Sequence, residues 1–248
     1  MESLVYVKVE PCRRPLLLSR CRHDCVFRGF ARSSPAARSL PLRSLQLDHR
    51  SSNLIQAHQL FEASGDKRNA LYAQLAAIRA GVEPIPLPAR SFKLTQELAT
   101  NPILQSDLEL RMYCLAVKGE IDGEIDNAAM RRDWTEVSKL AHDLDNAKWQ
   151  YRALGQLGFA DFYDGNLAGA QKKVAEALIG ATTIKDVGGQ IFFLSTTATG
   201  LVLQGMNDQA LEYADRAIAL ANATPDAGYP VIAEENRLMA MINLLSFE

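Results

Sequence analysis

The sequence offers few side chains whose types and spacing could support catalysis. Cys114 is a single cysteine inside a predicted helix, and a cysteine hydrolase would need a histidine base brought close to it. His142 is the one histidine that could serve, and nothing in the sequence around it supports that role. We therefore favour a buried structural thiol for Cys114, because an unactivated cysteine behaves as a small apolar residue.

Four acidic residues alternate along the predicted helix that contains Cys114: Glu120, Asp122, Glu124 and Asp126. Residues two positions apart do not share a helix face, so this spacing provides no carboxylate pair for acid–base chemistry. A solvated or groove-lining acidic surface is the interpretation we favour.

Motifs for metals and phosphates are equally weak. Cys21, His23 and Cys25, with Cys12 as a fourth ligand, match no standard zinc spacing. Gly188-Gly189-Gln190 has the letters of the release-factor tripeptide, but a linker between two helices explains it. Since no glycine-rich phosphate loop is present either, we expect no metal, no cofactor and no enzymatic activity.

Composition excludes several classes of protein. The chain has 248 residues, 48% of them hydrophobic and 23% charged, and its net charge is −2. This balance gives no reason to expect nucleic acid as a partner. Apolar runs of about four residues are far short of the roughly 20 that span a bilayer, so we expect a cytoplasmic protein without membrane contact. Four cysteines are too few for a disulfide scaffold.

The chain has two unlike parts. Residues 1–52 contain ten Lys or Arg and four Asp or Glu, and no helical or strand period runs through residues 10–45. We expect this segment to be a basic, disordered tail, since it could bury little apolar surface. An organelle transit peptide, or upstream sequence included through a misplaced start codon, are the alternatives. Residues 53–248 form the second part and the predicted folded domain.

This second part is predicted to be all-α. Good helix formers dominate it, apolar residues recur with helical spacing in 167–181 and 208–222, and no run alternates with period two. Residues 82–102 are predicted to form a proline-stiffened connector and a short helix, and one long helix is expected over about 104–130.

Small residues recur at fixed distances from each turn. Alanines lie five and twelve positions after the turn glycines Gly65, Gly165 and Gly205, and a small residue lies seven positions before the last two. After Arg132 the equivalent residues are Val137 and Leu144. The turn residues Gly65, Gly165 and Gly205, with a weaker match at Arg132, are separated by 67, 33 and 40 positions. The structural positions of this pattern are Gly65, Ala70, Ala77, Gly158, Gly165, Ala170, Ala177, Ala198, Gly205, Ala210 and Ala217.

This pattern resembles the tetratricopeptide repeat, a helix–turn–helix unit of about 34 residues. The resemblance implies an α-solenoid over roughly 53–248, in which the last spacing is one unit plus an insertion. It explains the small residues by the close approach of two helices, and the turn glycines by left-handed caps. The family's usual aromatic in the first helix is replaced by Leu154 and Leu194, and its closing prolines are mostly missing.

Several stretches are also similar to the helical regions that precede output domains, such as caspase-like CHAT domains, in large bacterial signalling proteins. They include Gly65–Ala73, Leu115–Asp122 and Asn222–Pro230. This second resemblance implies a regulatory module for a signalling or protease-like system.

A solenoid of this type implies a concave groove lined by the first helix of each pair. The predicted groove residues are Arg152, Phe159, Phe162, Tyr163, Phe192, Ser195 and Thr199. Aromatic side chains with an arginine suit an extended peptide or an amphipathic helix, although Phe162 and Phe192 could equally be core residues. Gly155 and Phe159 stand where related domains that bind chaperone tails carry a carboxylate clamp, which disfavours that ligand class.

The sequence therefore predicts a non-catalytic scaffold for a protein or peptide partner. A ligand-sensing module that controls an output domain is the alternative, followed by a cysteine hydrolase that uses Cys114. The terminal helix, about 229–247, is apolar on more than one side. Because solenoids normally end in a polar cap, we expect further repeats, a following domain or self-association to cover it.

Overall fold

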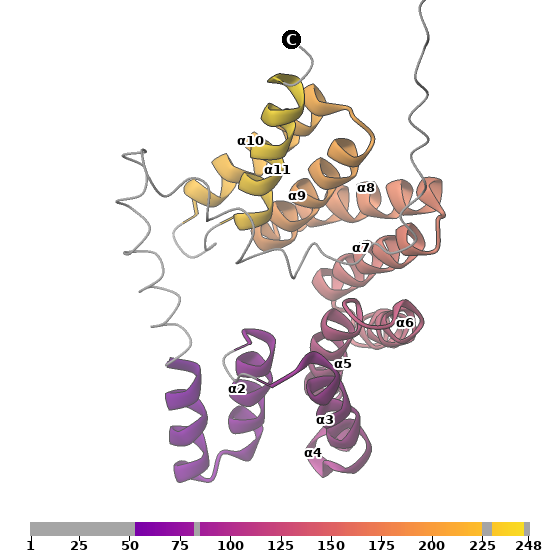
Figure 1. Ribbon diagram of the computed structural model, residues 1–248. Coiled ribbons are helices and arrows are strands. Elements are labelled where there is room, and N and C mark those ends of the chain that lie inside the picture. The colour runs from indigo at the N-terminus through magenta and orange to yellow at the C-terminus, as the bar shows by residue number, and fades with distance from the viewer. Residues whose placement is uncertain (1–52, 82–84, 225–229, 246–248) are drawn as a thin grey trace, which may run out of the picture. The chain divides into compact units, whose positions relative to one another are not determined.

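The computed structural model describes residues 53–81, 85–224 and 230–245, and in these residues every regular element is a helix (Figure 1). By its contacts the chain divides into two units, Met1–Asn53 and Leu54–Glu248. The expected basic tail, residues 1–52, lies outside the described residues. Among the described residues, no helix combines the length and the apolar composition needed to cross a bilayer.

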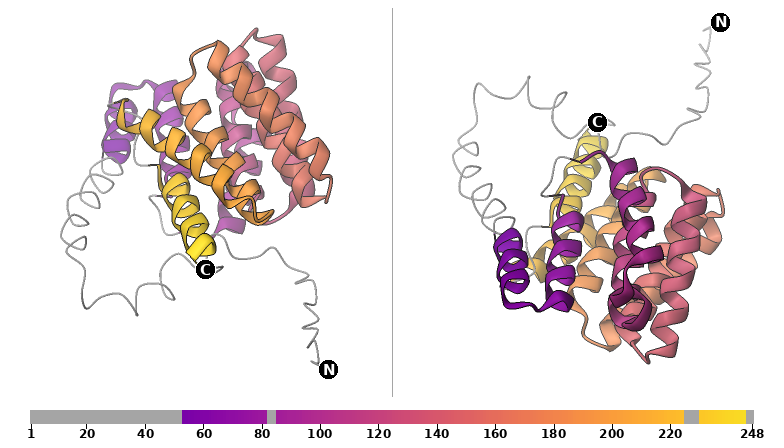
Figure 2. Two further views of the ribbon diagram at one scale, coloured as in Figure 1. Left: turned by 90° about the horizontal axis from the view of Figure 1, so that it is seen from above. Right: turned by 90° about the horizontal axis from the view of Figure 1, so that it is seen from below.

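In most of the described chain, consecutive helices are also neighbours in space. A helical segment over 53–64 comes first. It is followed by α2 (Lys67–Arg79), α3 (Leu87–Thr100), α4 (Pro102–Ser106), α5 (Leu108–Asp122), α6 (Asn127–Asp143), α7 (Ala147–Tyr163), α8 (Leu167–Thr183), α9 (Val187–Leu203), α10 (Asn207–Asn222) and α11 (Val231–Leu245). From α5 to α11 each helix packs on the next, and Figure 2 shows these helices as adjacent rods in both views.

The helices begin at regular intervals. The second helices of three successive hairpins, α6, α8 and α10, begin at Asn127, Leu167 and Asn207, and the first helices α7 and α9 begin at Ala147 and Val187. Four consecutive helices, α6 to α9, have 17 residues each. Three-residue connections join them, so that each helix plus connection takes 20 residues and each hairpin takes 40.

The connections repeat the same chemistry. Their middle residues, Asp145, Gly165, Lys185 and Gly205, all have positive φ, between 49° and 81°. The next residue is the N-cap, and the side chains of Asn146 and Asn166 accept a hydrogen bond from the N–H three residues on. A left-handed residue therefore ends each helix at the same position, and before α7 and α8 a polar side chain also caps the next helix.

The buried face of the second helices repeats with the same 40-residue period. In α10 it consists of Ala210, Ala214, Ala217 and Ala221. In α8 the equivalent positions hold Ala170, Val174, Ala177 and Ala181, and in α6 they hold Met130, Trp134, Val137 and Ala141. Alanine on this face allows the partner helix to approach closely, whereas Trp134 of α6 fills the space that opens beside Gly119 of α5.

Glycine on the first helices meets this face. A Cβ at Gly158 would lie 3.0 Å from Cγ2 of Val174 and 3.2 Å from the carbonyl oxygen of Ala170, so a larger residue would separate α7 from α8. The alanines of the predicted repeat, Ala70, Ala77, Ala170, Ala177, Ala198, Ala210 and Ala217, are all buried as well. Gly65, Gly165 and Gly205 have left-handed φ in turns.

Two details of the predicted repeat are wrong. From α6 to α10 the unit is 40 residues rather than about 34 plus one insertion, because each helix is longer by about three residues. The residue of α6 that is equivalent to Ala170 is Met130, not Val137, since bulky residues replace alanine there and no turn glycine marks the register. The long helix expected over 104–130 is also wrong, because Asp107 and Asp126 act as N-caps and divide this stretch into α4, α5 and α6.

Two glycines provide a matched test of this packing. A Cβ at Gly155 of α7 would overlap the ring of Phe193, which is fully buried, whereas a Cβ at Gly200 of α9 would meet nothing closer than Gln204 at 4.0 Å. We expect Gly155→Ala to lower the free energy of unfolding by about 1–3 kcal/mol through overpacking. Gly200→Ala should instead raise it by up to about 1 kcal/mol, since alanine favours a helix.

Urea unfolding followed by circular dichroism would measure both values. Equal effects of the two substitutions would show that α7 and α9 do not approach each other as described.

Candidate binding surface

Cys114 lies in the core and has none of the features of a nucleophile. It is fully buried in α5 among Leu75, Leu94 and Leu110, and burial raises the pKa of its thiol to about 12. His142 lies exposed on the last turn of α6. The thiolate is the reactive form of cysteine, and this environment disfavours it.

The alternating acidic residues do not form one surface. Glu120 forms an ion pair with Arg79 of α2, and Asp126 caps α6, where its side chain accepts a hydrogen bond from the N–H of Ala128. Asp122 is buried, and Glu124 lies in the turn after α5. The expectation of a single solvated or groove-lining acidic surface is therefore wrong, because the helix ends at Asp122 and the four side chains have different surroundings.

A buried ionic cluster joins α3, α5 and α6. Nζ of Lys118 lies 2.6 Å from Oδ2 of Asp122 and 2.9 Å from Oδ2 of Asp133, and Ser91 of α3 hydrogen-bonds to Asp122. One cation faces two carboxylates in this cluster. Burial raises the pKa of Asp133 to about 6, and the adjacent Asp122 carboxylate adds to this effect against the opposing charge of Lys118. No sequence pattern indicated this pair, because Asp122 and Asp133 lie on different helices and meet only when α5 packs on α6.

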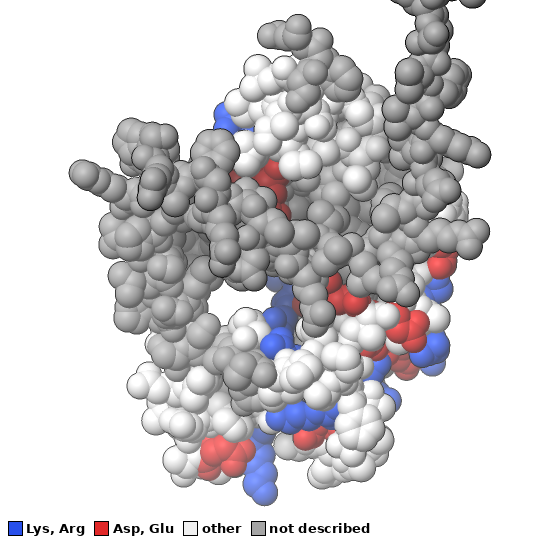
Figure 3. Space-filling model, in the orientation of Figure 1, with Lys and Arg blue, Asp and Glu red and all other residues white. Residues whose placement is uncertain are grey.

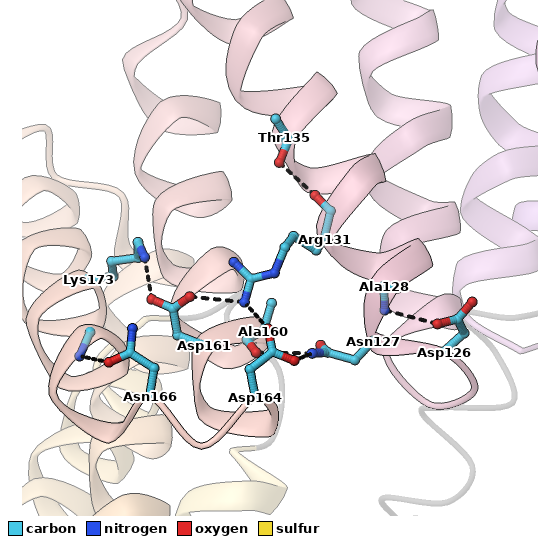
Figure 4. Close-up of polar contacts among 11 residues, drawn as sticks. Asp126, Asn127, Ala128, Arg131, Thr135, Ala160, Asp161, Asp164, Asn166 and Lys173 are labelled. Carbon is cyan, nitrogen blue, oxygen red and sulfur yellow. Dashed lines mark hydrogen bonds and ion pairs between the residues drawn. The ribbon is translucent and has the colours of Figure 1, made fainter.

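A second ionic network joins α6, α7 and α8 (Figure 4). Nη2 of Arg131 donates to Oδ1 of Asp161 at 3.0 Å and to Oδ2 of Asp164 at 2.6 Å, and Lys173 of α8 also binds Asp161. Although burial favours the neutral acid, Lys173 and Arg131 hold the pKa of Asp161 below its usual value. Two cations and two carboxylates balance one another, so this network holds three helices together and leaves no net charge for a ligand.

An open depression of about 540 Å³ lies over this network. It is lined by Ala128, Arg131, Arg132, Thr135, Glu136 and Asp164. None of these residues was a predicted site residue, and both signs of charge are present around it. Figure 3 shows the same mixture on the visible face of the lower helices, where Lys and Arg lie beside Asp and Glu.

Aromatic side chains form a contact chain across the first helices of the array. The rings of Tyr72 on α2 and Tyr113 on α5 stack with centroids 4.8 Å apart, and Tyr113 meets Trp149 of α7 edge-on at 6.1 Å. The guanidinium of Arg152 lies 5.5 Å from the centre of the Trp149 ring. Tyr72 is 49% exposed, and the other members remain partly exposed.

A second aromatic contact joins α7 to α9 further along α7. Phe159 contacts Phe192 with ring centroids 5.9 Å apart. We call these six residues the aromatic row: Tyr72, Tyr113, Trp149, Arg152, Phe159 and Phe192.

Ion pairs between neighbouring helices hold the row in place. Arg79 binds Glu120 through two hydrogen bonds of 2.7 and 2.5 Å, which links α2 to α5. Arg152 binds Asp186, the N-cap of α9, through bonds of 3.0 and 3.1 Å. Although burial works in the opposite direction, Arg152 holds the pKa of Asp186 below its usual value. The guanidinium of Arg152 is therefore engaged by Asp186 and positions α7 against α9.

The structure brings together only part of the predicted groove set. Arg152, Phe159 and Phe192 belong to the aromatic row, while Phe162 and Tyr163 contact each other at the end of α7. Ser195 is buried, and its carbonyl oxygen accepts a hydrogen bond from Asn236 of α11. Thr199 Oγ1 accepts another from the same side chain, so α11 occupies this part of α9. The sequence analysis did not identify Tyr72, Tyr113 and Trp149 as site residues. The spacing could have indicated Tyr113, because it lies about one repeat before Arg152, just as Arg152 lies one repeat before Phe192.

In the described part of the chain, no three histidine, cysteine or acidic side chains come together as a metal site would require. No protein-family model matches the sequence, and no curated protein matches it closely enough to count as a relative.

The Lys118–Asp122–Asp133 cluster gives a pH dependence with a definite sign. The pKa of Asp133 in the folded state, about 6, is above its ordinary value of 3.8, so the folded state binds more protons between these values. The contribution of this group to the free energy of unfolding must then fall as pH rises from about 4 to 6. The free energy of unfolding of Asp133→Asn, measured relative to that of wild type, should therefore rise by about 2 kcal/mol between pH 4 and pH 6.

Unfolding curves at pH 4, 5, 6 and 7 would measure this difference. Asp143→Asn, an exposed change on the same helix, controls for the loss of one charge. A constant difference between wild type and Asp133→Asn at all four pH values would contradict the assignment.

Proposed function

We propose that residues 53–248 form a non-catalytic α-solenoid of tetratricopeptide-like hairpins that binds an extended peptide segment of a partner protein along the aromatic row. The single observation that carries the proposal is the row itself. Partly exposed aromatic rings follow one another across α2, α5, α7 and α9, and inter-helix ion pairs fix their positions.

The chemistry of the row favours a peptide ligand. Tyrosine and tryptophan expose large contact areas at a low cost in side-chain entropy, and they are enriched among residues that dominate binding energy. Arg79, beside the row, is neutralised by Glu120, whereas Arg152 of the row and the neighbouring Lys148 share one carboxylate, Asp186. The surface thus has little net charge with which to attract nucleic acid, and it favours apolar side chains.

The spacing of the helices suggests the conformation of that peptide. Axes of packed helices lie about 8–10 Å apart, and one turn of a polyproline II helix advances about 9 Å. A peptide crossing the helices in this conformation would place every third side chain about 9 Å further across the surface, about the distance between the axes of packed helices. Proline-containing peptides adopt it before binding and therefore lose less entropy on aromatic surfaces. We propose ligands with apolar or proline residues at every third position.

Selection from a random peptide library by the full chain, followed by affinity measurement on the enriched peptides, tests this function. Tyr72→Ala removes an exposed ring from the row, and Phe92→Ala removes a ring from α3 that is 64% exposed and outside the row. We expect Tyr72→Ala to weaken binding at least fivefold, as loss of an aromatic anchor does, and Phe92→Ala to leave it unchanged.

The proposal fails if no peptide is enriched over a scrambled control. It also fails if the enriched peptides bind wild type and Tyr72→Ala equally well, because the row would then not be the site.

A further inference from the structure

The outer side of α11 is an extended apolar surface. Its exposed apolar residues are Val231, Ile232, Leu238, Met239, Met241, Ile242 and Leu245. In Figure 3 the surface over the C-terminal helices, at the top of the view, is mainly uncharged where it is not grey. Monomeric proteins seldom leave a continuous patch of this kind uncovered.

The helix register identifies this side of α11 as a helix-binding face. Ala233 of α11 is buried against Leu194 of α9 and Ala217 of α10. Phe193, which lies 40 residues earlier on α9, packs in the same way on the preceding hairpin. With this offset of 40, Val231, Glu234, Leu238 and Met241 correspond to Tyr151, Leu154, Gly158 and Asp161 of α7, two repeats earlier.

In α7 the residues at those four positions contact α8, the second helix of the hairpin. Tyr151 packs on Gly180, Leu154 on the core of α8, Gly158 on Ala170 and Val174, and Asp161 binds Lys173. The equivalent positions of α9 include Leu194, which packs on Ala217 of α10. On α11 the same face borders an open depression of about 360 Å³ lined by Val231, Glu234, Glu235, Arg237, Leu238 and Met241.

The side chains on this face differ from those of the other hairpins in size. Leu238 stands where α7 has Gly158 and α9 has Ala198, and it is 55% exposed. Close packing against an alanine-rich helix such as α8 or α10 depends on a small residue at this position. The occupant of this face must therefore be a helix that packs at a larger distance, side chain against side chain.

The sequence of α11 meets this requirement when it pairs with itself in antiparallel orientation. Val231 and Leu245 are each seven residues from Leu238, on opposite sides. A two-fold axis at Leu238 would set the two Leu238 side chains against each other and Val231 against Leu245 of the other copy. Seven residues are two helical turns, so both contacts fall on one stripe.

The charges of α11 favour the same arrangement. Glu234 and Glu235 lie near its beginning, and Arg237 is engaged by Asp215 of α10 at 2.8 Å. Antiparallel pairing keeps the acidic residues of the two copies at opposite ends, about 10 Å apart along the axis by the rise per residue. Parallel pairing would set them side by side and would be opposed by repulsion.

We infer that this face of α11 is a homodimer interface, in which α11 packs antiparallel on α11 of a second copy around a two-fold axis at Leu238. Such an interface is isologous and closes after two copies. It lies on α11, apart from the aromatic row on α2, α5, α7 and α9, so each copy would keep its peptide-binding surface.

Analytical ultracentrifugation of the full chain tests the association. We expect a reversible dimer, and Leu238→Glu should weaken it at least 100-fold by placing two carboxylates at the axis. The control is Leu203→Glu at the end of α9, where the side chain is 60% exposed. The Leu203→Glu variant should dimerise as wild type does. A wild-type chain that is monomeric up to 100 µM, or a dimer that Leu238→Glu leaves intact, overturns the inference.

Disulfide trapping tests the position of the two-fold axis, because residue 238 of one copy would meet residue 238 of the other. Leu238→Cys lies on the proposed axis and should give a disulfide-linked dimer under mild oxidation, whereas Leu203→Cys should not exceed the wild-type background from the native cysteines. Because position 238 is exposed, neither variant is expected to impair folding. A dimer by ultracentrifugation without trapping at position 238 would place the interface elsewhere and refute the arrangement.

Discussion

The architecture depends on one steric constraint, the close approach of neighbouring helices where one of them lacks a side chain. Gly158 lies against the backbone of Ala170, Gly155 against the ring of Phe193, and Gly119 against the indole of Trp134. Each contact sets the distance between two helices. Because a helix and its connection together repeat every 20 residues, equivalent positions meet again in the next pair of helices. The array is thus built from nearest-neighbour contacts, as expected for repeat proteins.

Ionic contacts act at the points where this steric fit leaves polar groups buried. Lys118 joins two carboxylates between α5 and α6, and Arg131 and Lys173 join Asp161 across α6, α7 and α8. Removing one partner of such a cluster would leave a buried charge without compensation, which is costly. These clusters fix the relative positions of the helices, and through them the geometry of the aromatic row.

The two surfaces that we propose for binding, the aromatic row and the exposed face of α11, lie on different sides of the first helices of the hairpins. Along α2, α5, α7 and α9, large aromatic side chains occupy the side that the hairpins leave partly open. On α11, large aliphatic side chains occupy the side that α8 covers on α7 and that α10 covers on α9. The first arrangement suits an extended chain that crosses the helices, and the second suits another helix lying along one of them.

The sequence by itself determined the helical class and the small residues of the hairpins, because composition and 3.6-residue periodicity are local properties. It also located the turns at Gly65, Gly165 and Gly205, where glycine reports a left-handed residue directly. It could not give the 40-residue register, because Asp145 and Lys185 adopt the same conformation without glycine, and Met130, Trp134 and Val137 replace the alanines of α6. Only the tertiary structure paired Asp122 with Asp133 and Arg152 with Asp186, and placed Asn236 on Ser195 and Thr199. These contacts join residues far apart in the chain, and no local pattern encodes which helix faces will meet.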